Sequence, residues 1–230
     1  MSPTKILIVL TNTAKYDHYN IPTGLWLGEL THFYDEVVTA GYAVDFVSPK
    51  GGYVPIDPYS MKFANDIDYK WYQNEDFRNQ ALANTKQPSD IHPEDYVAIY
   101  YTGGHGVLWD FPDNKALQTI AESIYQSGGY LAAVCHGVVG LLNLKDKQGD
   151  YLIKNKQVTG FTNTEEILSQ KARKVPFSTE NALKDRGANY QKVRFFKPYA
   201  VKDGRIITGQ NPWSPKEVAR LLLNALQKHD

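Results

Sequence analysis

The sequence has one cysteine, no net charge and no long apolar run, and each shortage excludes a class of protein. Because Cys135 is the only cysteine among 230 residues, no disulfide can form within the chain. The 25 basic and 25 acidic residues balance, so neither a nucleic acid nor an anionic membrane is an expected partner. No apolar run reaches the length of a membrane span, and no signal-peptide pattern precedes the first predicted strand. These absences predict a cytoplasmic protein with a free thiol.

Apolar segments alternate with amphipathic ones, which is the pattern of a parallel α/β sheet. Buried strands are predicted over residues 5–10, 43–48, 97–101 and 130–134, with helices over 25–40 and 114–126. No proline-rich or serine-rich linker divides the chain, so we predict a single domain over residues 1–230. The aromatic-rich segment at about 49–93 is predicted to be an insertion with one or two helices, which shapes either a pocket mouth or an oligomer contact.

The C-terminal third is predicted to hold two hairpins and two helices. One hairpin pairs 151–153 with 157–160, and the other pairs 199–201 with 205–208 around a type I′ turn at Asp203-Gly204. Helices are predicted over 178–187 and from Ser214 onward, where Pro215 takes the first helical position. The turn over 209–213 could add a wall to the crevice at the end of the sheet.

Cys135 stands between a buried strand and a short helix predicted over 138–142, with Gly137 and Gly140 allowing close packing. A thiol at such an elbow lies near a helix N-terminus and faces the crevice at the carboxyl end of the sheet, which favours a nucleophilic thiolate. The alternative is an inert buried cysteine that packs as a small hydrophobe. The adjacent His136 and the glycines favour the reactive interpretation.

The third strand ends in Gly103-Gly104-His105-Gly106. Glycines in this number let the backbone approach a ligand and direct amide groups at it, so the turn is predicted to stabilise an oxyanion beside Cys135. The glycine spacing matches neither a dinucleotide fingerprint nor a phosphate loop. A simple tight turn is the alternative. His105 could be a ligand or an acid/base group, although a surface histidine is the commoner case.

Three glutamates are candidates for a carboxylate role. Glu29 lies early in the first helix, where on spacing alone a solvated residue is the commoner case. Glu165 completes a capping box with Thr162 and is therefore expected to be structural. Glu166 has no capping role and could orient the histidine beside the cysteine. No metal site is expected, because one cysteine cannot form a thiolate cage and no histidines have metal-site spacing: His18, His32, His92, His105, His136 and His229.

Several of these motifs together resemble the ThiJ/PfpI superfamily, whose fold is similar to that of class I glutamine amidotransferases. They are the elbow over 132–137, the turn over 103–106, Thr23-Gly24 followed by Glu29, and 160–162 followed by Glu166. The Cys-His adjacency, the insertion and the segment 203–212 resemble the heat-shock branch that includes glutathione-independent glyoxalase III, or D-lactate dehydratase. The resemblance implies a flavodoxin-like parallel sheet sandwiched by helices. It also implies a Cys135 nucleophile completed by His136 and Glu166, with Glu29 held against the thiol as an acid/base group.

The activity implied by this resemblance is conversion of methylglyoxal to lactate without glutathione, metal or another cofactor, through a Cys135 hemithioacetal. A small dicarbonyl is the expected substrate, and a homodimer is the common assembly of similar proteins. Three alternatives stay open: a holdase chaperone that uses the aromatic insertion, an amidase or peptidase, and a peroxide sensor in which Cys135 becomes a sulfinic acid. Trp213 and Pro215 depart from the small residues usual in the resembling proteins, which could narrow the pocket or alter a partner surface.

Overall fold

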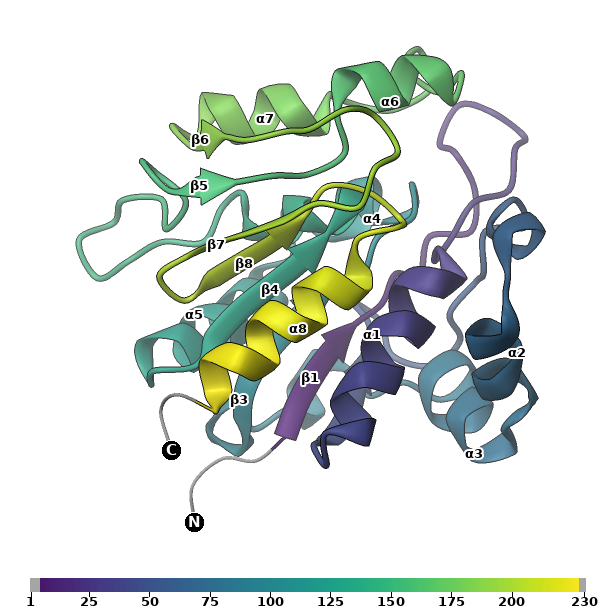
Figure 1. Ribbon diagram of the computed structural model, residues 1–230, viewed down its shortest axis with the longest axis horizontal. Helices are drawn as coiled ribbons and strands as arrows, with labels where there is room; N and C mark the ends of the chain where they lie inside the picture. Colours follow the sequence, from purple (N-terminus) through teal and green to yellow (C-terminus); the bar gives the residue numbers. More distant parts are fainter. Residues whose placement is uncertain (1–4, 228–230) are drawn as a thin grey trace.

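The computed structural model describes residues 5–227, and its centre is a six-stranded sheet in the order β2-β1-β3-β4-β8-β7 (Figure 1). Five strands run parallel, and β7 is an antiparallel edge strand. Their bounds are β1 Lys5–Val9, β2 Ala43–Val47, β3 Tyr96–Tyr101, β4 Tyr130–Val134, β7 Ala200–Asp203 and β8 Ile206–Gly209. The four strands predicted in the first 134 residues are confirmed, with ends shifted by no more than a residue.

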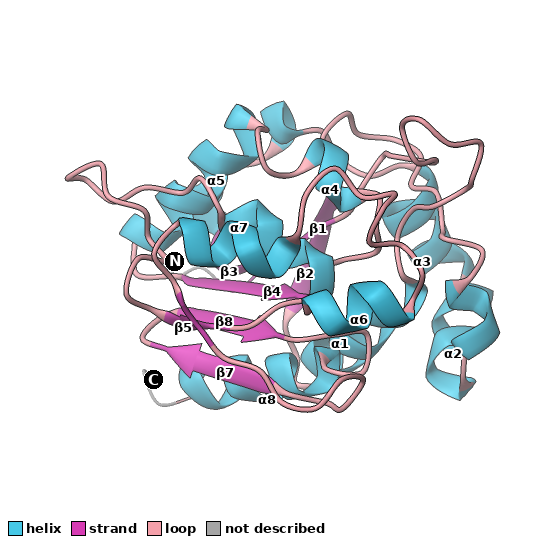
Figure 2. Cartoon of the chain, turned by 90° about the horizontal axis from the view of Figure 1, so that it is seen from above, coloured by secondary structure: helices cyan, strands magenta, loops and turns pink. Residues whose placement is uncertain are grey.

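Helices cover both faces of this sheet, as Figure 2 shows from above. On one face α1 (Leu27–Thr39) and α8 (Pro215–Leu226) pack side by side and bury Phe33, Val37 and Leu222 against the strands. On the other face lie α4 (Val107–Asp110) and α5 (Lys115–Gln126), which buries Leu117 and Ile120. Because both faces are covered, the central strands need apolar residues at every position, which explains their unbroken apolar runs. The predicted flavodoxin-like sandwich is confirmed.

The predicted insertion forms a helical layer beside α1. It contains a 3-10 helix (Ser60–Phe63), followed by α2 (Asp66–Gln73) and α3 (Glu75–Arg78). A short π-helix (Asn79–Ala83) continues α3, and two short 3-10 helices follow (Pro88–Asp90 and Pro93–Asp95). Asp68 fastens this layer to α1, because its carboxylate accepts from the Thr31 hydroxyl and lies 3.3 Å from His32 Nε2. The Leu25 amide donates to the Pro55 carbonyl at 2.8 Å, so the insertion also holds the loop before α1.

The predicted hairpin between 151–153 and 157–160 is wrong. Instead β5 (Gln157–Val158) pairs in parallel with β6 (Asn189–Tyr190), which follows α6 (Asn163–Leu168) and α7 (Thr179–Asp185). Asn155 has φ +61° and donates its amide to the Gly187 carbonyl, so the chain turns toward α7 rather than back on itself.

The β7–β8 hairpin is confirmed, but its turn is not type I′. The two loop residues are Gly204 and Arg205, and only Gly204 has positive φ, whereas type I′ requires it at both positions. None of the helices within residues 5–227 is long and apolar enough to cross a membrane. The single main sheet, with helices on both faces, supports the proposal of one domain over residues 1–230. Residues 1–4 and 228–230 of that range lie outside the described chain.

Candidate active site

The elbow after β4 places Cys135 at the carboxyl end of the sheet. Cys135 has φ +58°, a left-handed conformation that costs a residue with a Cβ on the order of 1–3 kcal/mol. The helix after the strand is a 3-10 helix over Cys135–Leu141, so it begins at the cysteine itself rather than at residue 138 as predicted. A Cβ on Gly137 would collide with the carbonyls of Tyr101 and Thr102, so only glycine lets this helix lie against β3.

His136 and Glu166 complete a chain of contacts from the thiol. Cys135 Sγ lies 3.4 Å from His136 Nδ1, and His136 Nε2 lies 2.7 Å from Glu166 Oε2. Burial, followed by the nearby His105, lowers the pKa of His136, which is therefore neutral at pH 7. Burial alone would raise the pKa of Glu166, but the two imidazoles hold it well below its usual range, so this carboxylate is ionised. Nε2–H then donates to Glu166, which leaves the Nδ1 lone pair of His136 directed at the thiol.

His105 shares the same carboxylate. Its Nε2 lies 2.6 Å from Glu166 Oε1, and the centres of the two imidazole rings are 4.2 Å apart. His105 is buried, unlike the surface histidine that was the commoner expectation. The turn over 103–106 is what brings it there, because Gly104 has φ +99° and a Cβ on it would collide with the Gly24 carbonyl. One carboxylate therefore orients two imidazoles.

Glu29 lies under the thiol and not in solvent. It is fully buried in the first turn of α1, and its Oε2 accepts the Gly103 amide at 2.6 Å. The Cys135 side chain is its other interaction partner, and Oε1 has no further hydrogen-bond partner among residues 5–227. Burial raises the pKa of Glu29 to about 8, only partly offset by the hydrogen bonds from Cys135 and Gly103. At pH 7 the carboxyl group is therefore protonated.

The thiol is protonated as well, although its place at the elbow was expected to favour a nucleophilic thiolate. Burial and the neighbouring Glu29 raise the pKa of Cys135 well above its usual range, although the His136 amide acts in the opposite direction. Desolvation of a sulfur anion outweighs the one amide at the start of a short 3-10 helix. Since the two acids are in contact, they titrate as a pair. Removing the thiol proton requires a base, and His136 Nδ1 is the group in position.

The two glycines of the turn predicted to stabilise an oxyanion have different roles. The Gly103 amide is occupied by Glu29, whereas Gly104 lines the cavity in front of Cys135 and its amide has no acceptor within residues 5–227. The His136 amide points to the sulfur. Of the amides of Gly103 and Gly104, therefore, that of Gly104 is the one without an acceptor in the described chain.

Above the thiol lies a cavity of about 780 Å³. The insertion contributes Tyr59 and Phe63 to its mouth, and Trp213 forms part of its wall. The insertion therefore shapes the pocket mouth, one of the two roles expected for it, and the turn over 209–213 supplies the predicted wall. Phe161, from the motif over 160–162, also lines the cavity, and further lining residues that the sequence pattern did not single out are Trp26, Lys62, Lys171 and Phe196.

Glu165 holds this wall in place and confirms its expected structural role. Its Oε2 closes a capping box with Thr162, while Oε1 accepts from the Phe196 amide at 2.8 Å and from Asn211 Nδ2 at 2.9 Å. The two adjacent glutamates of α6 thus have separate functions: Glu165 fixes the wall, and Glu166 orients the histidines.

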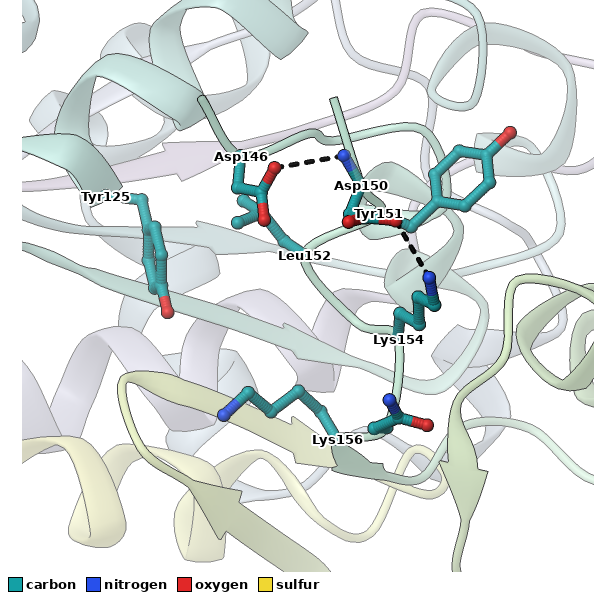
Figure 3. A pocket seen from close by; sticks show the side chains of 8 residues that line it. Tyr125, Asp146, Asp150, Tyr151, Leu152, Lys154 and Lys156 are labelled. Atoms are coloured by element: carbon teal, nitrogen blue, oxygen red, sulfur yellow. Dashed lines mark hydrogen bonds and ion pairs between the residues drawn. The ribbon is translucent and has the colours of Figure 1, made fainter. Parts of the chain in front are cut away.

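Two other features have the shape or the composition of a binding site. A concavity of about 350 Å³ near Tyr125 and Lys156 is lined by polar groups that pair with each other, among them Asp150 and Lys154 at 2.8 Å (Figure 3). Its lining residues include no cysteine, serine, threonine or histidine. The ligand atoms of His105, His136 and Glu166 lie within 4.8 Å of one another, a grouping compatible with a metal ion that histidine spacing did not reveal, and His229 lies outside the described residues.

Comparison with known proteins identifies the family. The model of the DJ-1/PfpI family matches residues 23–225, which include Glu29, the Gly103–Gly104 turn, Cys135 and Glu166. The chain belongs to the DJ-1/PfpI family. The resemblance drawn from the motifs is thereby confirmed.

Within this family the chain is similar to proteins named as glyoxalases. It is 36% identical to the glutathione-independent glyoxalase HSP31 of Saccharomyces cerevisiae, over 99% of this chain and 100% of that protein. The crystal structure of glyoxalase III from Candida albicans superposes with a TM-score of 0.86 at 32% identity, over 96% of this chain and 97% of that one. The structure of Rapid Encystment Protein 24 kDa from Francisella tularensis gives a TM-score of 0.93 at 37% identity, covering 98% and 99% of the two chains.

Proposed function

We propose that this chain is a glyoxalase III-type enzyme that converts methylglyoxal to D-lactate without glutathione and so removes a toxic dicarbonyl. The full-length similarity to named glyoxalases supports the reaction class. The observation that carries the proposal is the state of Glu29: a buried, protonated carboxyl group in contact with the only thiol, with an oxygen that lacks another partner. Such a group can give a proton to a substrate oxygen and later remove one from carbon.

The first step forms a hemithioacetal. His136 Nδ1 accepts the Cys135 proton, and Glu166 stabilises the resulting imidazolium through its 2.7 Å contact. The sulfur then bonds to the aldehyde carbon, and the electron pair of the C=O double bond moves to its oxygen, which takes the Glu29 proton. The Gly104 amide is the open donor for that oxygen while charge develops on it.

The second step moves hydrogen between the two substrate carbons. Glu29, now ionised, removes the proton from the thiol-bearing carbon, which gives an enediol whose second oxygen takes the proton held by His136. Glu29 then gives its proton to the second carbon and takes up the proton of the hydroxyl group on the thiol-bearing carbon, which becomes the carbonyl of a lactoyl thioester. Water cleaves the C–S bond of this thioester to release lactate and restore the thiol. The sum is addition of one water to methylglyoxal, so no oxidant, reductant or metal is consumed.

The test is lactate formation in the absence of glutathione, followed with a stereospecific D-lactate assay. The native chain is compared with Cys135→Ser, Glu29→Gln and the control Glu94→Gln, whose side chain is 75% exposed. We expect kcat/KM to fall by about 100- to 10,000-fold in the first two variants, because one lacks the nucleophile and the other lacks the acid/base group. Equal activity in native and Cys135→Ser protein would refute the proposal.

A holdase chaperone is the second candidate, supported by exposed apolar side chains around the cavity: Tyr59, Phe63, Leu168 and Trp213. Patches of this kind can bind unfolded chains. It predicts that suppression of aggregation of a heated client protein survives Cys135→Ala, whereas glyoxalase activity does not. The amidase and sulfinic-acid alternatives use the same thiol and would be lost with it. A homodimer and a cytoplasmic location stay predictions, the first to be measured by light scattering.

A further inference from the structure

The cavity above Cys135 is far larger than methylglyoxal requires. Its volume of about 780 Å³ lies within the range of roughly 300–1,000 Å³ that suits drug-sized ligands. We propose that its outer part is a subsite for a planar, negatively charged substituent, so that the enzyme prefers anionic aryl-type 2-oxoaldehydes to methylglyoxal. This inference rests on the proposed function, because the reacting end would undergo the same steps at Cys135.

Aromatic side chains from separate segments form one wall of this outer part. The Trp213 ring lies 5.9 Å from that of Phe63 and 5.5 Å from that of Phe196, and Phe63 lies 5.6 Å from Trp26. Trp213 and Phe63 are nonetheless 40% and 46% exposed. A planar ligand would cover this surface, and each aromatic pair adds about 0.5–1.5 kcal/mol beyond the area it buries.

The same cavity carries uncompensated positive charge. Lys62 and Lys171 both line it, and neither makes an ion pair with an acidic side chain in the described part of the chain. Their ammonium groups lie over aromatic rings, Lys62 at 5.1 Å from Tyr59 and Lys171 at 5.2 Å from Tyr16.

The acidic side chain among the lining residues does not balance the two lysines. Asp57 is buried, and its carboxylate already accepts from the Thr23 hydroxyl at 3.0 Å and the Tyr59 amide at 2.8 Å. Deeper in the site Glu29 is neutral, and Glu166 is engaged by two imidazoles. A carboxylate or phosphate on the substrate would therefore meet two ammonium groups that outnumber the one lining carboxylate and pair with no acidic side chain in the described chain.

Three substrates distinguish the contribution of the aromatic ring from that of the negative charge: methylglyoxal, phenylglyoxal and 4-carboxyphenylglyoxal. Each is assayed by formation of its 2-hydroxy acid. Because the carbonyls differ in intrinsic reactivity, the test is the change in substrate preference on mutation. Trp213→Ala should lower the ratio of kcat/KM for phenylglyoxal over methylglyoxal about 5- to 10-fold. Lys62→Gln with Lys171→Gln should lower the ratio for the carboxylated over the plain ring about 3- to 10-fold, and high salt should have the same effect on native protein.

Two controls lie away from the cavity: Tyr53→Ala, an aromatic side chain that is 70% exposed, and Lys147→Gln, an exposed lysine. Neither should change either ratio. If all variants keep the native ratios while methylglyoxal is turned over, the subsite is refuted and the proposed function stands.

A binding measurement tests the subsite even if the chain turns over no 2-oxoaldehyde. It uses calorimetry to measure binding of 4-carboxymandelate, the product expected from 4-carboxyphenylglyoxal. If no 2-oxoaldehyde is turned over in a Cys135-dependent way, but the lysine and Trp213 variants weaken this binding about tenfold, the proposed function fails and the subsite is supported. If the variants bind the product as the native chain does, the subsite is overturned whatever the turnover.

Discussion

Glu29→Gln is expected to inactivate the enzyme and at the same time to stabilise the fold, increasingly so as pH rises. In the unfolded chain this carboxyl group ionises near its ordinary pKa of 4.5, whereas in the folded chain its pKa is about 8. Between these values the unfolded state binds fewer protons than the folded state, so native stability falls as pH rises through the window. Glutamine keeps the shape of the neutral acid, and its carbonyl can still accept the Gly103 amide.

The size of the effect follows from the shift. Each pKa unit corresponds to about 1.4 kcal/mol. The raised pKa of Glu29 therefore lowers the free energy of unfolding of the native chain by about 3 kcal/mol at pH 7 and by about 5 kcal/mol above pH 8. At pH 5 the penalty is less than about 1 kcal/mol, because there the two states differ little in protonation. The variant should therefore gain on the native chain by about 2–3 kcal/mol between pH 5 and pH 7, or about 5–10 °C in Tm.

The assay is urea unfolding, followed by circular dichroism at pH 5, 6, 7 and 8, for native protein, Glu29→Gln and the exposed control Glu94→Gln. The control should follow the native curve at every pH, since surface substitutions rarely change stability by more than about 0.5 kcal/mol. A constant difference between Glu29→Gln and native protein across the series would show that Glu29 is not held protonated by the fold. The acid/base role proposed for it would then have to be withdrawn.

Further predictions concern the groups around the thiol. Glu166→Gln should lower kcat/KM about 100- to 10,000-fold, because a glutamine carbonyl can accept from one imidazole while its NH₂ opposes the other N–H; native-like activity would refute the pairing role. Gly137→Ala should destabilise the fold by about 1–3 kcal/mol, because its methyl group meets the Tyr101 and Thr102 carbonyls, and urea unfolding measures this. Gly28→Ala is its control for crowding, since this glycine of α1 has no positive φ and a Cβ there meets nothing closer than 3.5 Å; an equal loss in both would refute the packing argument.

The sequence predicted the sheet well, because its central strands are buried on both faces and their apolar runs are unbroken. The helices were predicted from their amphipathic spacing and from start signals such as Pro215 at the first position of α8, although Ser214, the expected capping serine, makes no side-chain capping hydrogen bond. The hairpin at 151–160 failed, since β5 pairs with a strand more than thirty residues later in the chain, and no local pattern signals such a partner.

The site was predicted in part. Chemistry-bearing residue types at strand ends pointed to Cys135 and His136, and the family resemblance moved Glu29 from solvent to the thiol. The protonation state could not be predicted, because it depends on how completely α1 and the turn over 103–106 cover the two acids. The shared use of Glu166 by His105 could not be predicted either, since it depends on where the turn over 103–106, the elbow helix and α6 meet in space.

The elbow strand has a consequence for the timing of folding. In the finished sheet β4 lies between β3 and β8, and β8 comes from residues 206–209, near the end of the described chain. During synthesis, Cys135 is therefore made long before β8, the strand that pairs with β4. His105 is likewise made 61 residues before Glu166, the carboxylate that orients it. Contacts this distant in sequence form late. The rate at which a small alkylating reagent modifies the single thiol should therefore report whether β8 has joined the sheet. Modification should be fast on the incomplete chain and slow once β8 has paired with β4.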